Sequence, residues 1–192
     1  SAMMNDLETV GNAQISTSAK KYGTGSMYFD GTGDYLKPNV STADLYAFGS
    51  GDFTIEMWAY ILQTTPEQML IDWRPAGTQT TQPLIYVTSA GVLAYYVNAA
   101  NRITGATLST GTWYHIAVCR SGTSTKMFLN GTQTGSTWTD STVYTNIAGR
   151  PVISLDGNTT NSGYLNGYID DLRITKGYAR YTTTFTPPTA AL

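Results

Sequence analysis

The chain has 192 residues, of which 41% are hydrophobic and 12% are charged, and its formal net charge is −2. This length and hydrophobic content are enough for one sizeable core, and all-β sandwiches of this size often form a single domain. The small net charge excludes the basic surface by which proteins attract nucleic acid or anionic lipid. No apolar run approaches the roughly 18 residues of a membrane-spanning helix, so we expect neither nucleic-acid binding nor membrane insertion.

The ends and the cysteine content give two further expectations. The opening residues look like the remnant of a cleaved expression tag, so residues 1–3 are set aside. Residues 4–192 are expected to form one domain, a piece of a longer protein. Cys119 is the sole cysteine and lies in an apolar run, so we expect a buried, small hydrophobic side chain rather than a disulfide.

The first predicted elements along the chain are a helical turn and a strand. Ser41 to Gly49 combines a polar start with a glycine that fits a helix C-cap. Phe53 to Ile61 alternates apolar residues with polar or aromatic ones. This period of two predicts a strand with one face on a core.

Two hairpins and a central strand follow. Leu84 to Val87 and Val92 to Val97 flank a turn at Ser89-Ala90-Gly91, and Asn130-Gly131 predicts a second tight turn. Tyr114 to Arg120 is apolar at nearly every position, as expected of a strand that lies mid-sheet with both faces covered. The 19 glycines and the many Thr, Asn and Ser clusters indicate short strands joined by turns. We therefore predict an all-β fold, a two-sheet antiparallel sandwich.

Four segments of the chain resemble a known family. They are Tyr28 to Tyr35, Asp52 to Trp58, Trp113 to Gly131, and Gly167 to Tyr181 with the Thr/Pro run that follows. In these segments the chain resembles the laminin-G-like branch of the concanavalin A-like lectin/glucanase superfamily. The resemblance implies a jelly-roll topology in which Ser26 to Asp30 pairs near Tyr168 to Ile174.

The implied pairing of first and last strands predicts a metal site. It would bring Asp30 and Asp34 toward Asp170 and Asp171. Carboxylate and backbone oxygens on a flexible turn suit hard cations, and many laminin-G-like relatives bind calcium, so a Ca²⁺ site at these four residues is one prediction. The alternative is that Asp30 and Asp34 only form the turn and that the other two pair with Arg173.

Catalysis is not expected of this chain. Glycosidases need two carboxylates within about 5–10 Å of each other, and the glucanases of the superfamily carry them as Glu-x-Asp-x-x-Glu, which this sequence lacks. The single histidine, His115, falls in a strand and is expected to have a structural role. A glycosidase that uses Asp72 or Asp140 instead is a minor alternative.

Ligand recognition is the remaining chemistry, because aromatic rings and planar polar side chains suit sugars. Trp58 and Trp113 fall in strands and are expected to pack, whereas Trp73 and Trp138 fall in loops and are expected to be exposed. The predicted ligand-binding set is Trp73, Arg74, Tyr96, Trp138, Tyr144, Arg150 and Asn158. The alternative is that the two loop tryptophans cap the sandwich or contact another protomer.

The resemblance extends to modules of bacteriophage tail or virion proteins and of bacterial adhesins. It implies an extracellular, cell-surface or virion location. We therefore predict a non-catalytic lectin-like module that binds a cell-surface glycan or glycoconjugate in host recognition, with several copies presented by a homo-oligomeric parent fibre. The alternative is a structural module that makes protein–protein contacts within a fibre or virion.

Overall fold

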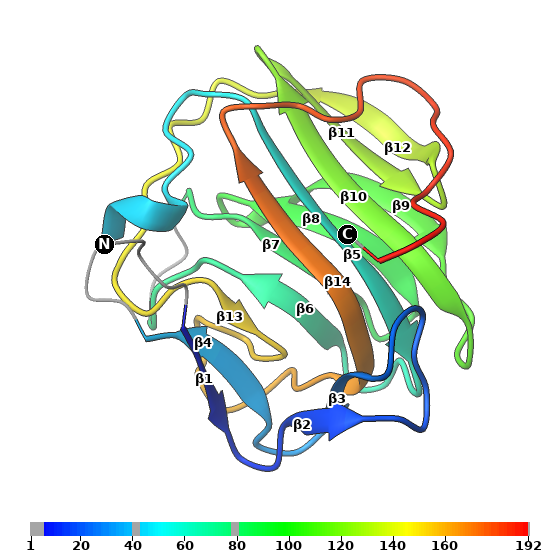
Figure 1. The fold of residues 1–192 in the computed structure, drawn as a ribbon. Helices are drawn as coiled ribbons and strands as arrows, with labels where there is room; N and C mark the ends of the chain where they lie inside the picture. The colour runs from blue at the N-terminus through cyan, green and yellow to red at the C-terminus, as the bar shows by residue number, and fades with distance from the viewer. Residues whose placement is uncertain (1–5, 40–42, 78–80, 192) are drawn as a thin grey trace.

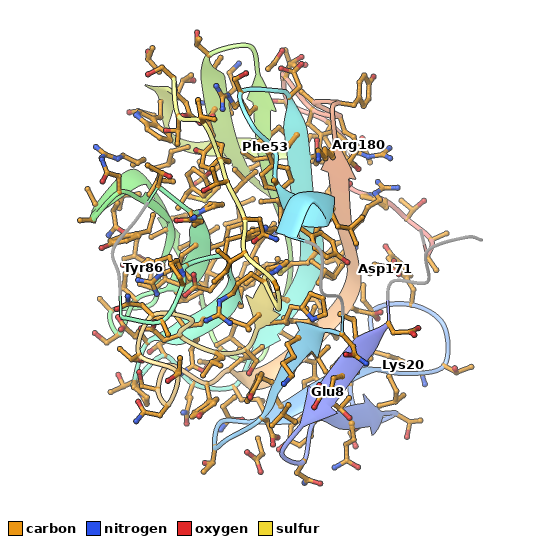
Figure 2. The ribbon with its side chains drawn as sticks, turned by 90° about the vertical axis from the view of Figure 1, so that its left-hand side faces the viewer. Glu8, Lys20, Phe53, Tyr86, Asp171 and Arg180 are labelled. Carbon is orange, nitrogen blue, oxygen red and sulfur yellow. The ribbon has the colours of Figure 1, made fainter. Side chains whose placement is uncertain are left out.

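The computed structural model describes residues 6–39, 43–77 and 81–191 (Figure 1). Within these residues, fourteen strands form two seven-stranded sheets, and neighbouring strands pair antiparallel. The sheets pack face to face, and Figure 2 shows the two layers edge on. The predicted all-β, two-sheet antiparallel sandwich is therefore confirmed.

The two sheets are named here by the order in which the chain enters them. In spatial order the first sheet contains β1 (Leu7–Val10), β4 (Tyr35–Pro38), β13 (Val152–Ile153), β6 (Gln68–Asp72), β7 (Leu84–Val87), β8 (Val92–Val97) and β9 (Ala100–Thr107). The second sheet contains β12 (Thr132–Thr139), β11 (Ser124–Leu129), β10 (Trp113–Ser121), β5 (Phe53–Ile61), β14 (Asn166–Lys176), β3 (Ser26–Asp30) and β2 (Gln14–Ser16). The 3₁₀ turn η1 (Ala43–Tyr46) precedes β5.

The locally predicted elements are present. β5 has the predicted bounds, and β10 contains the predicted central stretch and lies between β11 and β5. Both hairpins form, the first with Gly91 at φ 80° and the second with Asn130 at φ 50° and Gly131 at φ 80°. Of the helical turn predicted over 41–49, η1 covers 43–46, whereas residues 41 and 42 lie outside the described residues. Over the described ranges, no helix has the length and apolar character needed to cross a bilayer.

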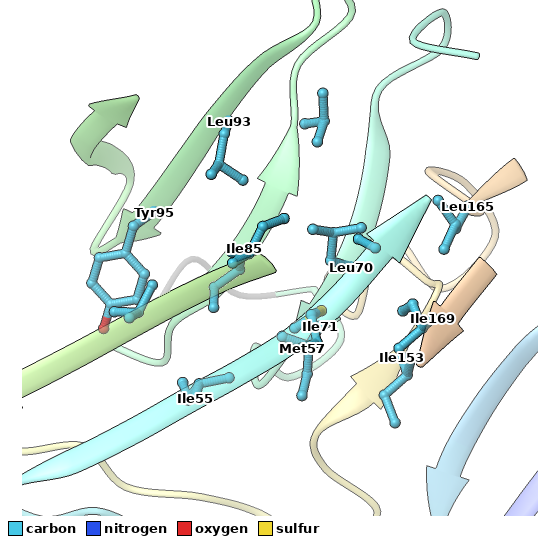
Figure 3. Close-up of a cluster of buried hydrophobic side chains, with 14 of the residues drawn as sticks. Ile55, Met57, Leu70, Ile71, Ile85, Leu93, Tyr95, Ile153, Leu165 and Ile169 are labelled. Atoms are coloured by element: carbon cyan, nitrogen blue, oxygen red, sulfur yellow. The ribbon is translucent and has the colours of Figure 1, made fainter. Parts of the chain in front are cut away.

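The core lies between the sheets and is filled from alternate strand positions, because successive side chains of a strand point to opposite faces. Ile55 and Met57 of β5 belong to one buried cluster with Ile71 of β6 and Ile85 of β7 (Figure 3). Burial of each such side chain contributes about 1.5–3 kcal/mol. The outer faces of both sheets are thereby left to loops, the chain end and solvent.

The C-terminal strap, residues 178–190, crosses the outer face of the second sheet (red in Figure 1). Phe185 N donates a hydrogen bond to Gly131 O at 3.0 Å, and the Phe185 carbonyl occupies the space that any side chain at Gly131 would need. The rings of Phe185 and Tyr181 stack with centroids 3.5 Å apart and pack on the cluster that contains Cys119. Cys119 is buried as predicted, and burial raises the pKa of its thiol to about 11.

Glu56 of β5 lies under this strap and is fully buried, with 0% of its side chain exposed. Arg173 Nη2 lies 2.7 Å from Glu56 Oε1, and Tyr181 OH donates a hydrogen bond to Oε2 at 2.8 Å. His115 Nε2 lies 3.3 Å from Oε2, and both side chains are buried, as expected of a histidine with a structural role. Burial acts to raise the pKa of Glu56, but the contacts with His115, Tyr181 and Arg173 outweigh it and hold the pKa below its usual value.

Replacing Glu56 with glutamine is expected to lower the free energy of unfolding near pH 7 by about 1.5–3 kcal/mol, the usual contribution of hydrogen bonds to a charged group. Because the folded-state pKa is depressed, this stabilisation is present above the unfolded-state value of about 4.3 and is lost as pH falls through the folded-state pKa. Urea unfolding of both proteins near pH 7 and at about pH 3 measures the effect. An equal difference at both pH values would contradict it.

Candidate ligand site on the first sheet

A groove of about 240 Å³ opens on the outer face of the first sheet, over β6, β7 and β8. Its lining combines two half-buried aromatic rings, two apolar side chains and three charged groups, namely Glu67, Met69, Arg74, Leu84, Tyr86, Tyr96 and Asp156. Figure 2 places Tyr86 on the opposite side of the sandwich from Arg180 and Asp171. Two residues of the predicted ligand set, Arg74 and Tyr96, therefore line this groove.

The two rings of the groove are positioned by the β7–β8 hairpin. Its register pairs Leu84 with Tyr96 and Tyr86 with Ala94, so the two tyrosines occupy diagonal positions on one face. Their rings meet edge to face, with centroids 6.5 Å apart and an interplanar angle of 87°. Tyr86 OH donates a hydrogen bond to Asn101 Oδ1 at 3.0 Å, which fixes the outer ring from β9. Burial raises the pKa of Tyr86, so its hydroxyl stays protonated.

The floor of the groove is a buried charge network. Arg74, only 4% exposed, places its guanidinium 5.3 Å from the Tyr96 ring centroid. Its Nη2 lies 2.7 Å from Asp72 Oδ2 and 2.9 Å from Asp156 Oδ1. Burial acts to raise the pKa of Asp72, and the hydrogen bonds and positive charge of Arg74 act against that rise. Such buried charges are tolerated only when paired and hydrogen-bonded.

Arg150 and Asn158 position the loop that completes the network. Arg150 Nε donates to Arg74 O at 2.7 Å, and its Nη2 donates to Gly157 O at 2.8 Å. Burial lowers the pKa of Arg150. Asn158 N donates to Asp156 Oδ1 at 2.8 Å. Both predicted ligand residues therefore lie beside the groove, where they support its floor rather than line it.

Trp73 is not exposed, and the prediction that it contacts a ligand is wrong. Trp73 comes directly after β6, and its side chain points into the core and is 1% exposed. Its ring lies 5.5 Å from that of Phe48, and its Nε1 donates a hydrogen bond to Tyr46 O at 3.2 Å. The indole is part of the core, so it can contact neither a sugar nor another protomer.

Tyr144 is likewise a core residue, and its predicted ligand role is wrong. Its hydroxyl donates to Asp140 Oδ2 at 2.7 Å and accepts a hydrogen bond from Tyr95 OH at 3.0 Å. Asp140, itself fully buried, also accepts from Thr125 Oγ1 at 2.8 Å. Asp140 and the Arg74-bound Asp72 are thus both held in structural contacts, which leaves the minor glycosidase alternative without an accessible carboxylate at either position.

Trp138 lies on β12 of the second sheet and does not contribute to the groove. The side chain is half-buried and packs against the core. Its ring centroid is 6.3 Å from that of Tyr95, and the Arg102 guanidinium lies 5.5 Å from it. The indole covers the side where β9 and β12 approach each other, so the alternative that it caps the sandwich fits better than ligand contact.

The predicted pairing of Ser26–Asp30, which is β3, with the last strand β14 is confirmed, but it does not assemble the predicted metal site. Asp30 lies opposite Asn166 on β14. Asp170 is four residues beyond Asn166 on β14. At the usual rise per residue of a strand, Asp170 therefore lies about 13 Å along the strand from the position opposite Asp30. The prediction that the pairing brings Asp30 and Asp34 toward Asp170 and Asp171 is therefore wrong.

The carboxylates of the predicted metal set have structural partners. Asp34 Oδ2 accepts from Asp30 N at 3.0 Å, and Asp30 Oδ1 accepts from Thr32 N at 2.8 Å, as in the turn-forming alternative. Asp170 Oδ2 accepts from Lys21 N at 2.9 Å. In the part of the chain that the structure describes, no three His, Cys, Asp or Glu side chains form a group that could hold a metal ion. Calcium binding stays a prediction, which a melting curve with and without chelator tests.

Sequence reasoning missed Tyr86, Glu67 and Asp156 as lining residues. Tyr86 could have been identified from the sequence. The predicted turn at Ser89 to Gly91 sets the register of the hairpin, and this register puts Tyr86 on the same sheet face as Tyr96. The two acidic residues come from segments distant in sequence, and their approach depends on the packing of β6 and β13. No local sequence pattern indicates that Glu67 and Asp156 approach each other.

Comparison with known proteins gives the family of the chain. A family model described as the concanavalin A-like lectin/glucanases superfamily, of the laminin G type, matches residues 30–180. Among curated proteins, none matches the chain.

Solved structures share the fold at low sequence identity. Domain 4 of AbnA, a GH43 extracellular arabinanase from Geobacillus stearothermophilus in complex with arabinotriose, has a TM-score of 0.63 and 16% identity over 88% of this chain and 77% of that one. The carbohydrate binding module CBM66 from Bacillus subtilis gives 0.54 and 14% over 90% and 97%. Domains LG4-5 of the mouse laminin alpha1 chain give 0.54 and 15% over 84% and 41%. With its two-sheet sandwich and a family match that spans most of its length, this chain belongs to the concanavalin A-like lectin/glucanase superfamily.

Proposed function

We propose that this chain is a non-catalytic glycan-binding module whose ligand site is the groove over β6, β7 and β8. The observation that carries this proposal is the pair of half-buried rings, Tyr86 and Tyr96, above the buried Arg74 network. Ligand sites combine apolar and aromatic walls with a few fixed polar groups. Here the rings suit the C–H faces of a sugar, and Glu67 and Asp156 offer acceptors to its hydroxyls.

The charge network supports binding rather than hydrolysis. Asp156 Oδ1 accepts hydrogen bonds from Arg74 Nη2 at 2.9 Å and from the backbone N–H groups of Asn158 at 2.8 Å and Thr159 at 3.1 Å. Three donors hold this carboxylate as a fixed acceptor, whereas a glycosidase needs one carboxyl group that can deliver a proton. Glu67 alone does not supply the pair that hydrolysis requires.

The comparisons support the same proposal at the level of fold. Two of the similar structures are, by their names, an arabinanase domain with bound arabinotriose and a carbohydrate binding module. We extend the proposal to an extracellular or surface location on a parent fibre, adhesin or phage tail protein. A homo-oligomeric parent would raise the avidity of sites that are individually weak, because linked sites bind at high effective concentration.

A structural module that makes only protein contacts is the rival proposal. This rival proposal requires exposed tryptophans that anchor a protein interface. Trp73 is inside the core and is not available as the predicted anchor, and the half-buried Trp138 packs against the core, which leaves only part of its ring to contact a partner. The groove over the first sheet therefore favours a ligand.

The purified chain on a glycan array, in calcium and again in chelator, tests the proposed function. For at least one of the glycans bound, Tyr96→Ala and Tyr86→Ala are each expected to weaken affinity at least about tenfold, equivalent to about 1.4 kcal/mol. Titration calorimetry measures the change. Tyr178→Ala is the matched control, because Tyr178 is 61% exposed and lies on the strap across the opposite sheet. Equal affinities for all four proteins would contradict the proposed site.

A further inference from the structure

Four aromatic side chains form a continuous row across the second sheet. The strand registers place Tyr28 of β3 opposite Tyr168 of β14, Tyr168 opposite Tyr60 of β5, and Tyr60 opposite Trp113 of β10. Successive ring centroids are 4.9, 5.8 and 5.3 Å apart. We call these four residues the aromatic row.

The aromatic row lies on the outer face of the second sheet. The sequence neighbours Phe29, Ile169 and Ile61 belong to the buried core, so the row residues beside them point outward. Tyr28, Tyr60 and Trp113 are half-buried, and Tyr168 is nearly buried between its neighbours. Four strands at about 4.8 Å spacing make the row about 14 Å long.

Other parts of the chain cover the positions next to the row on this outer face. Two residues along β5 from the row, Trp58 packs edge to face with Tyr22 at 5.9 Å and lies 4.0 Å from Lys21 Nζ. His115, opposite Trp58, lies 5.6 Å from the ring of Phe185 of the strap. The strap and the β2–β3 loop thus cover the adjacent positions, and the aromatic row keeps its exposure at the end of the sheet.

A polar groove of about 490 Å³ continues the row toward β2. Its lining consists of hydroxyl, amide and aromatic groups with one aliphatic side chain, namely Gln14, Ile15, Ser16, Thr17, Ser18, Tyr28 and Tyr168. Gln14 pairs with Tyr28, so its side chain extends the row by one strand. Of the described residues that line this groove, none is charged.

The charge near the groove disfavours anionic ligands. Asp30 follows Tyr28 at the end of β3, and Asp34 receives a hydrogen bond from Asp30 N. Burial raises the pKa of Tyr28, and the negative charges of both aspartates act in the same direction. An acidic polysaccharide or nucleic acid would meet this negative end without a lysine or arginine in the groove lining to offset it.

We propose that the aromatic row and the polar groove form a second glycan site, which binds a single chain of a neutral, linear polysaccharide. A row this long spans several sugar units, and stacking on successive rings gives contacts that are repeated along the chain. The rings are tilted from one another by 39°, 77° and 55°. This twisted arrangement suits a free soluble chain and does not suit the flat surface of a crystalline polymer.

The second site is independent of the groove on the first sheet. The two lie on opposite outer faces of the sandwich, so one molecule could hold two glycan chains at once. An experiment that excludes the second site would therefore not contradict the first site, and one that excludes the first site would not contradict the second. Variants at Tyr96 report on the first groove and variants at Trp113 report on the row.

Affinity electrophoresis in gels that contain neutral arabinan, xylan, mannan or mixed-linkage glucan tests this proposal. Retardation is expected in at least one gel and is expected to persist in Tyr96→Ala. In that gel, Trp113→Ala and Tyr60→Ala are each expected to weaken binding about tenfold. Trp113→Tyr keeps a ring at the same place and is expected to restore most of the retardation, which a loss of folding at this position would not explain.

Any of several outcomes would overturn the proposal. Retardation in none of the neutral gels, or retardation that is unchanged in both Trp113→Ala and Tyr60→Ala, would exclude the second site. Stronger retardation in polygalacturonate than in every neutral gel would exclude the neutral class of ligand. Binding to microcrystalline cellulose that is lost in Trp113→Ala would exclude the preference for a free chain. A concentration-dependent mass that Trp113→Ala abolishes would assign the row to self-association instead.

Discussion

Replacing Trp73 with alanine is expected to lower the free energy of unfolding by about 3–5 kcal/mol, as for other large buried aromatic residues. The indole is 1% exposed and packs beside Phe48 in the core. Its removal leaves a cavity and deprives the Tyr46 carbonyl of the hydrogen bond from Nε1. Urea unfolding followed by circular dichroism measures the loss. The folded variant is expected to bind its glycan with unchanged affinity, because the indole faces away from the groove.

Trp138→Ala is the matched control for this tryptophan. Its side chain is half-buried at the side of the sandwich, so its loss removes less packing and is expected to be less destabilising. A loss below about 1 kcal/mol for Trp73→Ala, together with lost glycan affinity, would return Trp73 to the ligand site.

The strands and turns could be predicted because their signals are local. β5 is bounded as its alternation indicates, and Asn130 and Gly131 adopt the positive φ values that their residue types allow. The resemblance supplied what local physics does not, namely the topology that places β3 beside β14. Alternation then settles which side chains of a strand share a face, provided that no bulge intervenes.

A bulge in β6 is one reason why the inward direction of Trp73 could not be predicted. The β6–β7 register shifts between Met69 and Ile71, and Leu70 and Ile71 both belong to the core cluster. Such a shift reverses the face of every later side chain, so the inward direction of Trp73 does not follow from a run of apolar residues. A second shift, between Asp170 and Arg173 on β14, lies beyond the residues that pair with β3, so the distance between Asp30 and Asp170 follows from the strand register and not from this bulge.

The ligand groove could be predicted only in part, because its floor is assembled from distant segments. Arg74 and Asp156 are 82 positions apart and meet through the packing of the loop that Arg150 supports. The sequence shows aromatic and polar residues in several loops, but the choice among them depends on which loops share a sheet face. Arg74 is predicted to bind a ligand because it lies in a polar loop, and the structure shows that its guanidinium is the cation at the centre of the groove floor.

Replacing Arg74 with alanine is expected to lower the free energy of unfolding by about 3–5 kcal/mol, the usual effect of breaking a buried ion pair. The substitution leaves the fully buried Asp72 without its opposite charge and removes one donor from Asp156. Arg102→Ala is the control, since the half-buried Arg102 donates to the backbone carbonyls of Val97 and Asn98 and has no ion pair among the described residues. Its loss is expected to cost less than about 1.5 kcal/mol.

A double-mutant cycle separates the pair from its surroundings. If Arg74 and Asp72 stabilise each other, Asp72→Ala in the Arg74→Ala background is expected to cost less than in the native chain, by about 0.5–3 kcal/mol. Additive costs would contradict the ion pair as the source of stability. The same substitution removes the cation beside Tyr96, so glycan affinity of the still-folded Arg74→Ala protein is expected to fall as well. Stability and binding are expected to share this arginine because the floor that holds β6 to its loop is also the surface of the proposed ligand site.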